Sequence, residues 1–197
     1  MVFLNSGDMQ NFNEKLKQPL FYNNEKSLRF DFLRVLWFRN VRAIIFIKKI
    51  VNNIFSNNKT LLINEIALAD DDGDCPFLRY VDQKAKLLGK EIYDFNSDDD
   101  GYIESCEMIR YLWAVDTDKI KWVKLIRDLC TSKNNKLRKH LIYIVNPLNG
   151  MVMNIYDHRG MDVVYDSVDK MKEHYVKYYN WISEYDREDI ELIFKNS

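Results

Sequence analysis

The chain has 197 residues, a formal net charge of −1 and a composition that is 47% hydrophobic and 30% charged. This composition excludes intrinsic disorder, and the near-neutral charge argues against a nucleic-acid partner. The three cysteines, Cys75, Cys106 and Cys130, form no CxxC pair, which is typical of a reducing compartment. We find no secretory signal and no apolar run of about 20 residues that could span a membrane. The sequence therefore predicts a cytoplasmic protein that is not bound to a membrane.

The first half of the chain predicts two strands separated by a helix. A helical lead-in over residues 1–18 precedes a segment, 28–32, in which apolar and polar residues alternate as in a half-buried strand. From 37 to 55 the apolar residues recur at helical spacing. Residues 60–68 predict a second strand.

The middle of the chain predicts a β-hairpin and a helix. A turn-rich loop over 69–76 leads into residues 77–88, which are ambiguous between helix and strand. Residues 90–95 and 106–115 predict two strands joined by an acidic connection. Asp116 or Thr117 is then expected to cap a helix over 118–130.

The C-terminal part predicts three short strands, LIYIVN, MVMNIYD and MDVVYD, joined by two tight turns. Asp166 or Ser167 is expected to cap the following helix, and Ser183 and Asp186 resemble the start of a last one. Short turns imply antiparallel pairing. We therefore expect a single α+β domain with a mostly antiparallel sheet of about six strands and helices mainly on one face. Its parts are the lead-in (1–18), an α+β part (19–130) and a meander with two helices (140–195).

The acidic connection matches the spacing of a calcium-binding EF-hand loop. With Gly101 at the sixth position, the ligands would be Asn96, Asp98, Asp100, Tyr102 through its carbonyl, Glu104 and Glu107. Against this interpretation, the first ligand is Asn, and EF-hands usually occur in pairs. The end of the segment also reads equally well as a strand. We therefore favour an acidic hairpin loop and expect no metal.

A second polar group, Asp157, His158, Arg159 and Asp162, surrounds a predicted turn. It could act as an acid–base group only in a cleft that shifts the pKa values. The alternative, which we favour, is that Arg159 pairs with a neighbouring carboxylate and fixes the turn. The sequence contains no phosphate-binding loop, zinc-ligand spacing or nucleophile motif. We therefore expect neither enzymatic activity nor a cofactor.

Several segments, above all NIYDHRGMDVVYDS and YYNWISEYDREDIELIF, resemble the uncharacterised bacterial DUF3885 family. Members of that family carry a similar order of segments, with a turn of the type IYDDRGxDV and a closing NDWILDYDRExID. The resemblance covers residues 19–194, and His158 stands where a second Asp is usual. It implies no established activity, and it implies that the acidic connection is a variable loop between strands.

The leading functional hypothesis is a small protein that binds another protein, such as an immunity protein that neutralises a cognate toxin. A toxin directed at nucleic acid tends to have a basic cleft, which an acidic loop would complement. The acidic residues expected to bind it are Asp94, Asp98, Asp99, Asp100, Glu104 and Glu107. The alternative is an enzyme or a small-ligand or metal-binding protein that uses the turn at 157–162 or the acidic loop at 96–107. The sequence leaves the oligomeric state open.

Overall fold

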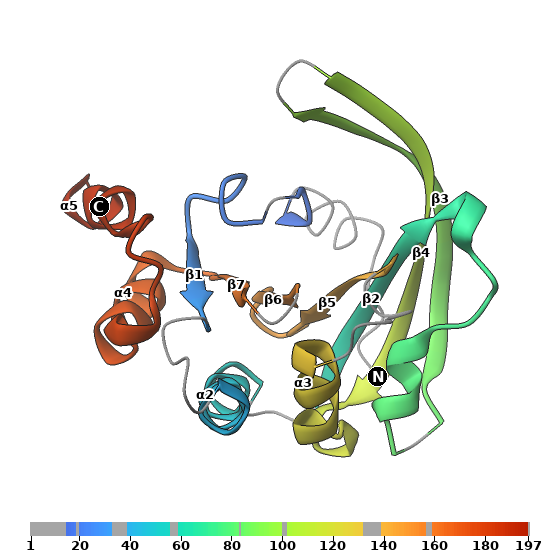
Figure 1. Ribbon diagram of the computed structural model, residues 1–197, viewed down its shortest axis with the longest axis horizontal. Coiled ribbons are helices and arrows are strands. Elements are labelled where there is room, and N and C mark those ends of the chain that lie inside the picture. Colours follow the sequence, from blue (N-terminus) through green and yellow to red (C-terminus); the bar gives the residue numbers. More distant parts are fainter. Residues whose placement is uncertain are drawn as a thin grey trace.

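Seven strands form one antiparallel sheet in the order β1-β7-β6-β5-β2-β4-β3 (Figure 1). The computed structural model describes residues 15–18, 20–32, 39–55, 59–82, 84–99, 102–131, 139–156 and 159–196. The strands are β1 (Ser27–Asp31), β2 (Lys59–Ala67), β3 (Lys86–Asp99), β4 (Tyr102–Asp116), β5 (Leu141–Val145), β6 (Val152–Ile155) and β7 (Gly160–Val164). The helices are α2 (Arg39–Ile54), α3 (Trp122–Thr131), α4 (Val168–Lys177) and α5 (Arg187–Asn196). The α+β class is confirmed, with seven strands rather than about six.

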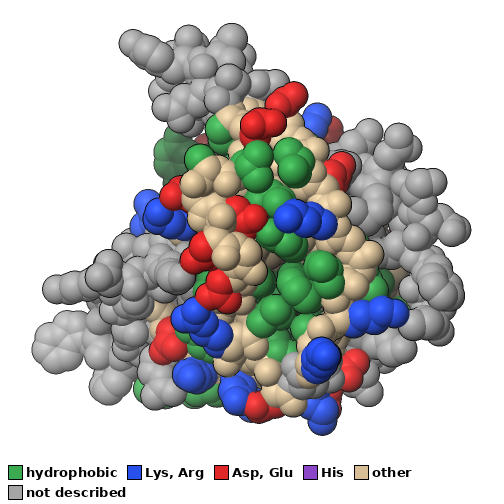
Figure 2. Space-filling model, turned by 90° about the vertical axis from the view of Figure 1, so that its right-hand side faces the viewer, with side chains coloured by type: hydrophobic (Ala, Val, Ile, Leu, Met, Phe, Trp, Pro, Cys, Tyr) green, Lys and Arg blue, Asp and Glu red, His purple; other side chains and the backbone are tan. Residues whose placement is uncertain are grey.

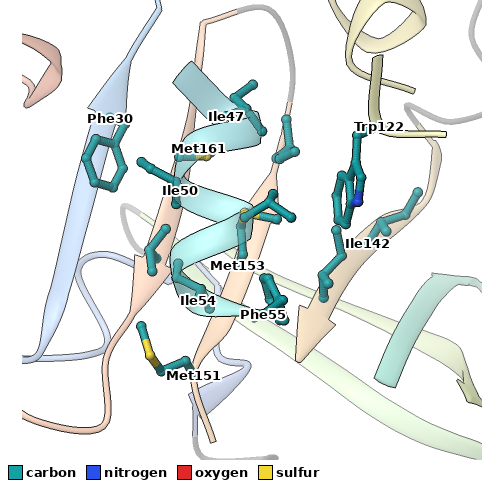
Figure 3. Packing of buried hydrophobic residues seen from close by; sticks show 14 of the residues in the cluster. Phe30, Ile47, Ile50, Ile54, Phe55, Trp122, Ile142, Met151, Met153 and Met161 are labelled. Carbon is teal, nitrogen blue, oxygen red and sulfur yellow. The ribbon is translucent and has the colours of Figure 1, made fainter. Parts of the chain in front are cut away.

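The four α-helices of the described residues all contribute to the hydrophobic core on one face of the sheet. Figure 1 shows α2 and α3 below the sheet, with α4 and α5 at its β1 end. Because side chains of a strand alternate between the two faces, every second residue of each strand points at the helices. Figure 3 shows Ile47, Ile50 and Ile54 of α2 lying against Met153 of β6 and Met161 of β7.

The opposite face of the sheet is covered over β5, β6 and β7 by residues 15–18 and 20–24. Leu16 and Leu20 pack there on a second apolar cluster that includes Tyr143. The Gln18 amide donates a hydrogen bond to the Tyr143 hydroxyl at 3.0 Å, and the backbone N–H of Phe21 donates to Asp162 at 3.3 Å. This segment therefore holds the polar groups of that face out of water.

Two local predictions about the middle of the chain are resolved by the structure. The prediction that Asp116 or Thr117 caps the third helix is wrong: Thr117–Lys119 form a 3-10 turn, and α3 begins only at Trp122. The indole N–H of Trp122 donates to the carbonyl of Thr117 at 3.1 Å, and Ile120 forms a bridge with Val81, so the residues before Trp122 are held outside the helix. The ambiguous stretch divides into a 3-10 helix, Pro76–Tyr80, and the start of β3.

Of the two C-terminal helices, α4 begins as the sequence predicts, whereas α5 begins later than a box starting at Ser183 would place it. The Ser167 hydroxyl accepts a hydrogen bond from the backbone N–H of Lys170 at the start of α4. The next helix, α5, begins at Arg187, directly after the buried Asp186. None of the described helices has the length and apolar character that a membrane crossing requires.

Candidate functional site

The predicted acidic residues lie on the long hairpin of β3 and β4, which rises beyond the rest of the sheet (Figure 1). Asp94 and Glu107 are exposed and are direct cross-strand partners. Two like charges in such a pair repel each other, so a cation bound between them would relieve the repulsion. Asp100 lies outside the described residues, as do the side chains of Asp98, Asp99 and Glu104.

The calcium interpretation can be compared with the backbone of the same hairpin. Asn96 pairs with Ser105 and Asp99 pairs with Tyr102 in a regular antiparallel register, although the side chains of Asn96 and Tyr102 are not described. An EF-hand loop lies between two helices, whereas here both flanking segments are strands. In the part of the chain that the structure describes, no three His, Cys, Asp or Glu side chains are placed to hold a metal ion. The backbone favours the acidic hairpin.

Next to the acidic pair lies a group of apolar side chains, which we call the β3–β4 strip: the exposed Leu87, Leu88 and Ile92, with the partly buried Trp113 and the buried Tyr111 beside them. Leu87 and Leu88 are each 44% exposed and Ile92 is 54% exposed. Leu87 is opposite Trp113, and a β-bulge between Leu87 and Gly89 inserts Leu88 as an extra residue. In such a bulge two consecutive residues oppose one on the neighbouring strand, so both leucines border Trp113.

Figure 2 shows hydrophobic side chains gathered in one band on the side of the molecule where β3 and β4 lie, with acidic side chains along its border. Part of that border is the loop after β2, where Asp70, Asp72 and Asp74 lie. Asp71 of the same loop accepts a hydrogen bond at 2.7 Å from the Tyr111 hydroxyl. Burial and this hydrogen bond together raise the pKa of Tyr111 to about 12. The sequence analysis missed the strip; its one local signal was the glycine inside a strand pattern, which indicates a bulge.

Asp162, which follows the turn between β6 and β7, forms an ion pair with Arg29 of β1. The Arg29 guanidinium donates to both carboxylate oxygens of Asp162, at 3.0 and 3.2 Å. Burial alone would lower the pKa of Arg29, but the hydrogen bonds and charge of Asp162 outweigh it and raise that pKa. Asp157 and His158 lie outside the described residues.

A cavity of about 320 Å³ lies beside this turn. Its lining residues are Gln18, Arg29, Tyr156, Arg159 and Asp162. The Arg159 guanidinium carbon lies 6.0 Å from the centre of the Tyr156 ring. The structure therefore brings two of the predicted turn residues, Arg159 and Asp162, to one cavity with the unpredicted Arg29.

A buried ionic group on the same sheet face was also missed by sequence reasoning. Arg110 of β4 donates to Glu65 of β2 through Nε, and to Glu91 of β3 through Nη1 at 3.4 Å. Arg110 is only 6% exposed and Glu65 only 2%. Burial, reinforced by the charge of Glu65, raises the pKa of Tyr143 well above its ordinary value. This group connects three neighbouring strands at the base of the hairpin.

Comparison with known proteins adds one finding. The sequence model of a family described as a domain of unknown function (DUF3885) matches residues 8–186. Searches of curated proteins and of solved structures found no match. The matched region contains both the β3–β4 hairpin and the turn at Asp162.

Proposed function

Because the chain belongs to the DUF3885 family, whose function is unknown, we propose a function from its surface: the protein binds another protein through the β3–β4 strip. The observation that carries this proposal is the run of exposed apolar side chains on β3, Leu87, Leu88 and Ile92. Contiguous exposed apolar surface rimmed by polar residues marks interaction sites on soluble proteins. Covering these side chains would remove apolar area from water.

The charges around the strip indicate the chemistry of the partner. Asp94 and Glu107 face each other at the hairpin end of the strip. The loop after β2 adds Asp72, whereas its Asp70 and Asp74 are paired with Lys139 and Arg79. A partner with an apolar centre and a basic rim would complement both features, and its association would be accelerated by the opposite charges. Proteins that act on nucleic acid carry such basic surfaces. We therefore propose neutralisation of a nucleic-acid-directed toxin as the specific role.

The test is co-expression with the products of neighbouring reading frames, followed by isolation of any complex and measurement of its affinity. We expect Leu88→Asp to weaken the complex at least tenfold, because it places a charge in the apolar centre of the interface. Glu107→Lys should slow association and reduce its dependence on salt. Leu192→Asp on α5 and Glu173→Lys on α4 are matched exposed controls, which should change neither the affinity of the complex nor its association rate. The absence of any complex, or equal affinities for all four variants, would refute the proposal.

A second candidate function rests on the cavity beside the β6–β7 turn, which Arg29, Asp162 and Arg159 line. Because Arg29 already donates to both carboxylate oxygens of Asp162, the guanidinium of Arg159 is the group that suits a small carboxylate or phosphate ligand. We expect such a compound to raise the melting temperature of the wild type, whereas Arg159→Ala should abolish this rise and leave the unliganded melting temperature unchanged. Lys195→Ala, on exposed α5, is the control. If small carboxylates and phosphates leave the wild type unchanged, or if Arg159→Ala unfolds the protein, the turn is structural.

A further inference from the structure

The two edges of the sheet differ. At the β1 edge, residues 182–183 pair with the backbone of β1. Ile182 forms a bridge with Phe30, and the N–H of Ser183 donates to the carbonyl of Arg29 at 3.1 Å. At the other edge lies β3, which has 14 residues and, among the described residues, pairs only with β4. An uncovered edge strand presents a row of backbone donors and acceptors that can pair with another strand.

We propose that this edge pairs with β3 of a second copy of the chain, antiparallel and centred on Ile92. The sequence around Ile92 is Lys90-Glu91-Ile92-Tyr93-Asp94. In an antiparallel pair centred on Ile92, each Lys90 lies opposite Asp94 of the other copy, and the two Ile92 side chains meet on the two-fold axis. Directly opposed side chains of a pair lie about 4.5–5.5 Å apart at Cβ, close enough for both ion pairs and the apolar contact.

The structure places these side chains where the pairing needs them. Lys90, Ile92 and Asp94 are all exposed and lie on one face of the sheet. The Lys90 ammonium now lies over the Tyr111 ring, 5.1 Å from its centre. Asp94 has the carboxylate of Glu107 opposite it on β4. Lys90 of a second copy would therefore supply the cation that this pair of carboxylates favours.

On the other face of the sheet, the side chains that this register pairs are also complementary in shape. Gly89 and Phe95 become cross-strand partners, since both lie three residues from Ile92. A Cβ atom built on Gly89 would have no atom within 4 Å, so space is open above it. An aromatic ring opposite a glycine covers its exposed backbone. Phe95 is only partly buried within one copy, and the pairing would bury it further.

This inference shares Ile92 and Asp94 with the proposed function, but it concerns the backbone edge of β3, and its readout, the oligomeric state, is separate from the affinity for another protein. Edge pairing would join two seven-stranded sheets and place the two β3–β4 strips side by side. The two Ile92 side chains would cover each other, whereas Leu87 and Leu88 lie farther from the two-fold axis.

The test is a charge exchange followed by sedimentation equilibrium. The wild type should be a dimer, and Lys90→Asp or Asp94→Lys alone should raise the dimer dissociation constant by on the order of tenfold or more, because each puts like charges opposite each other twice. The double variant, Lys90→Asp with Asp94→Lys, should dimerise as the wild type does. A mixture of the two single variants should form a heterodimer, because all four charges are then matched.

Lys172→Asp and Glu173→Lys on α4 provide matched controls that should leave the dimer intact. Lys172 is exposed and lies over an aromatic ring, that of Phe194, as Lys90 does over Tyr111. Circular dichroism establishes that each variant is folded. A monomeric wild type, or single variants that dimerise as tightly as the wild type, would overturn the proposal. So would a mixture that forms no heterodimer.

Discussion

Replacing Arg110 with Met is expected to lower the free energy of unfolding by about 3–5 kcal/mol, because it leaves the carboxylate of Glu65 buried without its cation. Glu65 is 2% exposed, so water cannot take the place of the guanidinium. Urea unfolding at neutral pH measures this effect.

The control is the double variant Glu65→Leu with Arg110→Met, which removes both charges. Apolar side chains of similar size often replace a buried ion pair at no cost. Its stability should therefore be close to that of the wild type. A single variant as stable as the wild type at neutral pH would show that the ionic group contributes nothing to the hairpin base.

Gly160→Ala is expected to destabilise the protein by roughly 3 kcal/mol, at the upper end of the range for overpacking. A Cβ atom on Gly160 would lie 2.2 Å from the carbonyl oxygen of Phe30 and 2.5 Å from the Tyr156 hydroxyl. The carbonyl belongs to β1, which pairs with β7, so it cannot move without breaking that pairing. Thermal unfolding monitored by circular dichroism gives the measurement.

Gly89→Ala tests whether the effect is specific to the close approach at Gly160. Within one copy a Cβ atom at position 89 meets no atom within 4 Å, so at concentrations where the protein is monomeric this substitution should be neutral or stabilise the fold by about 0.5 kcal/mol through the unfolded chain. Equal losses of stability for Gly160→Ala and Gly89→Ala would contradict the steric explanation. A loss of stability for Gly160→Ala alone would show that packing requires a glycine at the start of β7.

Much of the fold could be predicted because the decisive signals are local. Alternation at 28–32 and helical spacing at 37–55 correspond to β1 and α2, and Ser167 caps α4 as predicted. The cap at Asp116 or Thr117 was wrong because the residues just before α3 pair with a distant segment: Ile120 forms a bridge with Val81, and the N–H of Lys121 donates to the carbonyl of Tyr80. The sheet has seven strands rather than the predicted six or so, but its α+β class is the predicted one.

The candidate sites could be predicted only in part, because they depend on register. Asp162 was recognised as a polar turn residue, but its partner Arg29 lies 133 residues earlier in the chain and becomes its neighbour only when β1 pairs with β7. Glu65 and Arg110 are likewise brought together by the pairing of β2 with β4. A pattern of single residues carries no information about which strands are neighbours.

The sequence by itself determined the α+β class, most of the secondary-structure elements and the family, because periodicity, turn residues and motifs are read along the chain. Tertiary structure alone decided which strand lies at the open edge, which leucines stay exposed beside the acidic pair and which charges are buried together. These properties depend on how strands that are distant in sequence pair, and on what each face of the sheet then covers.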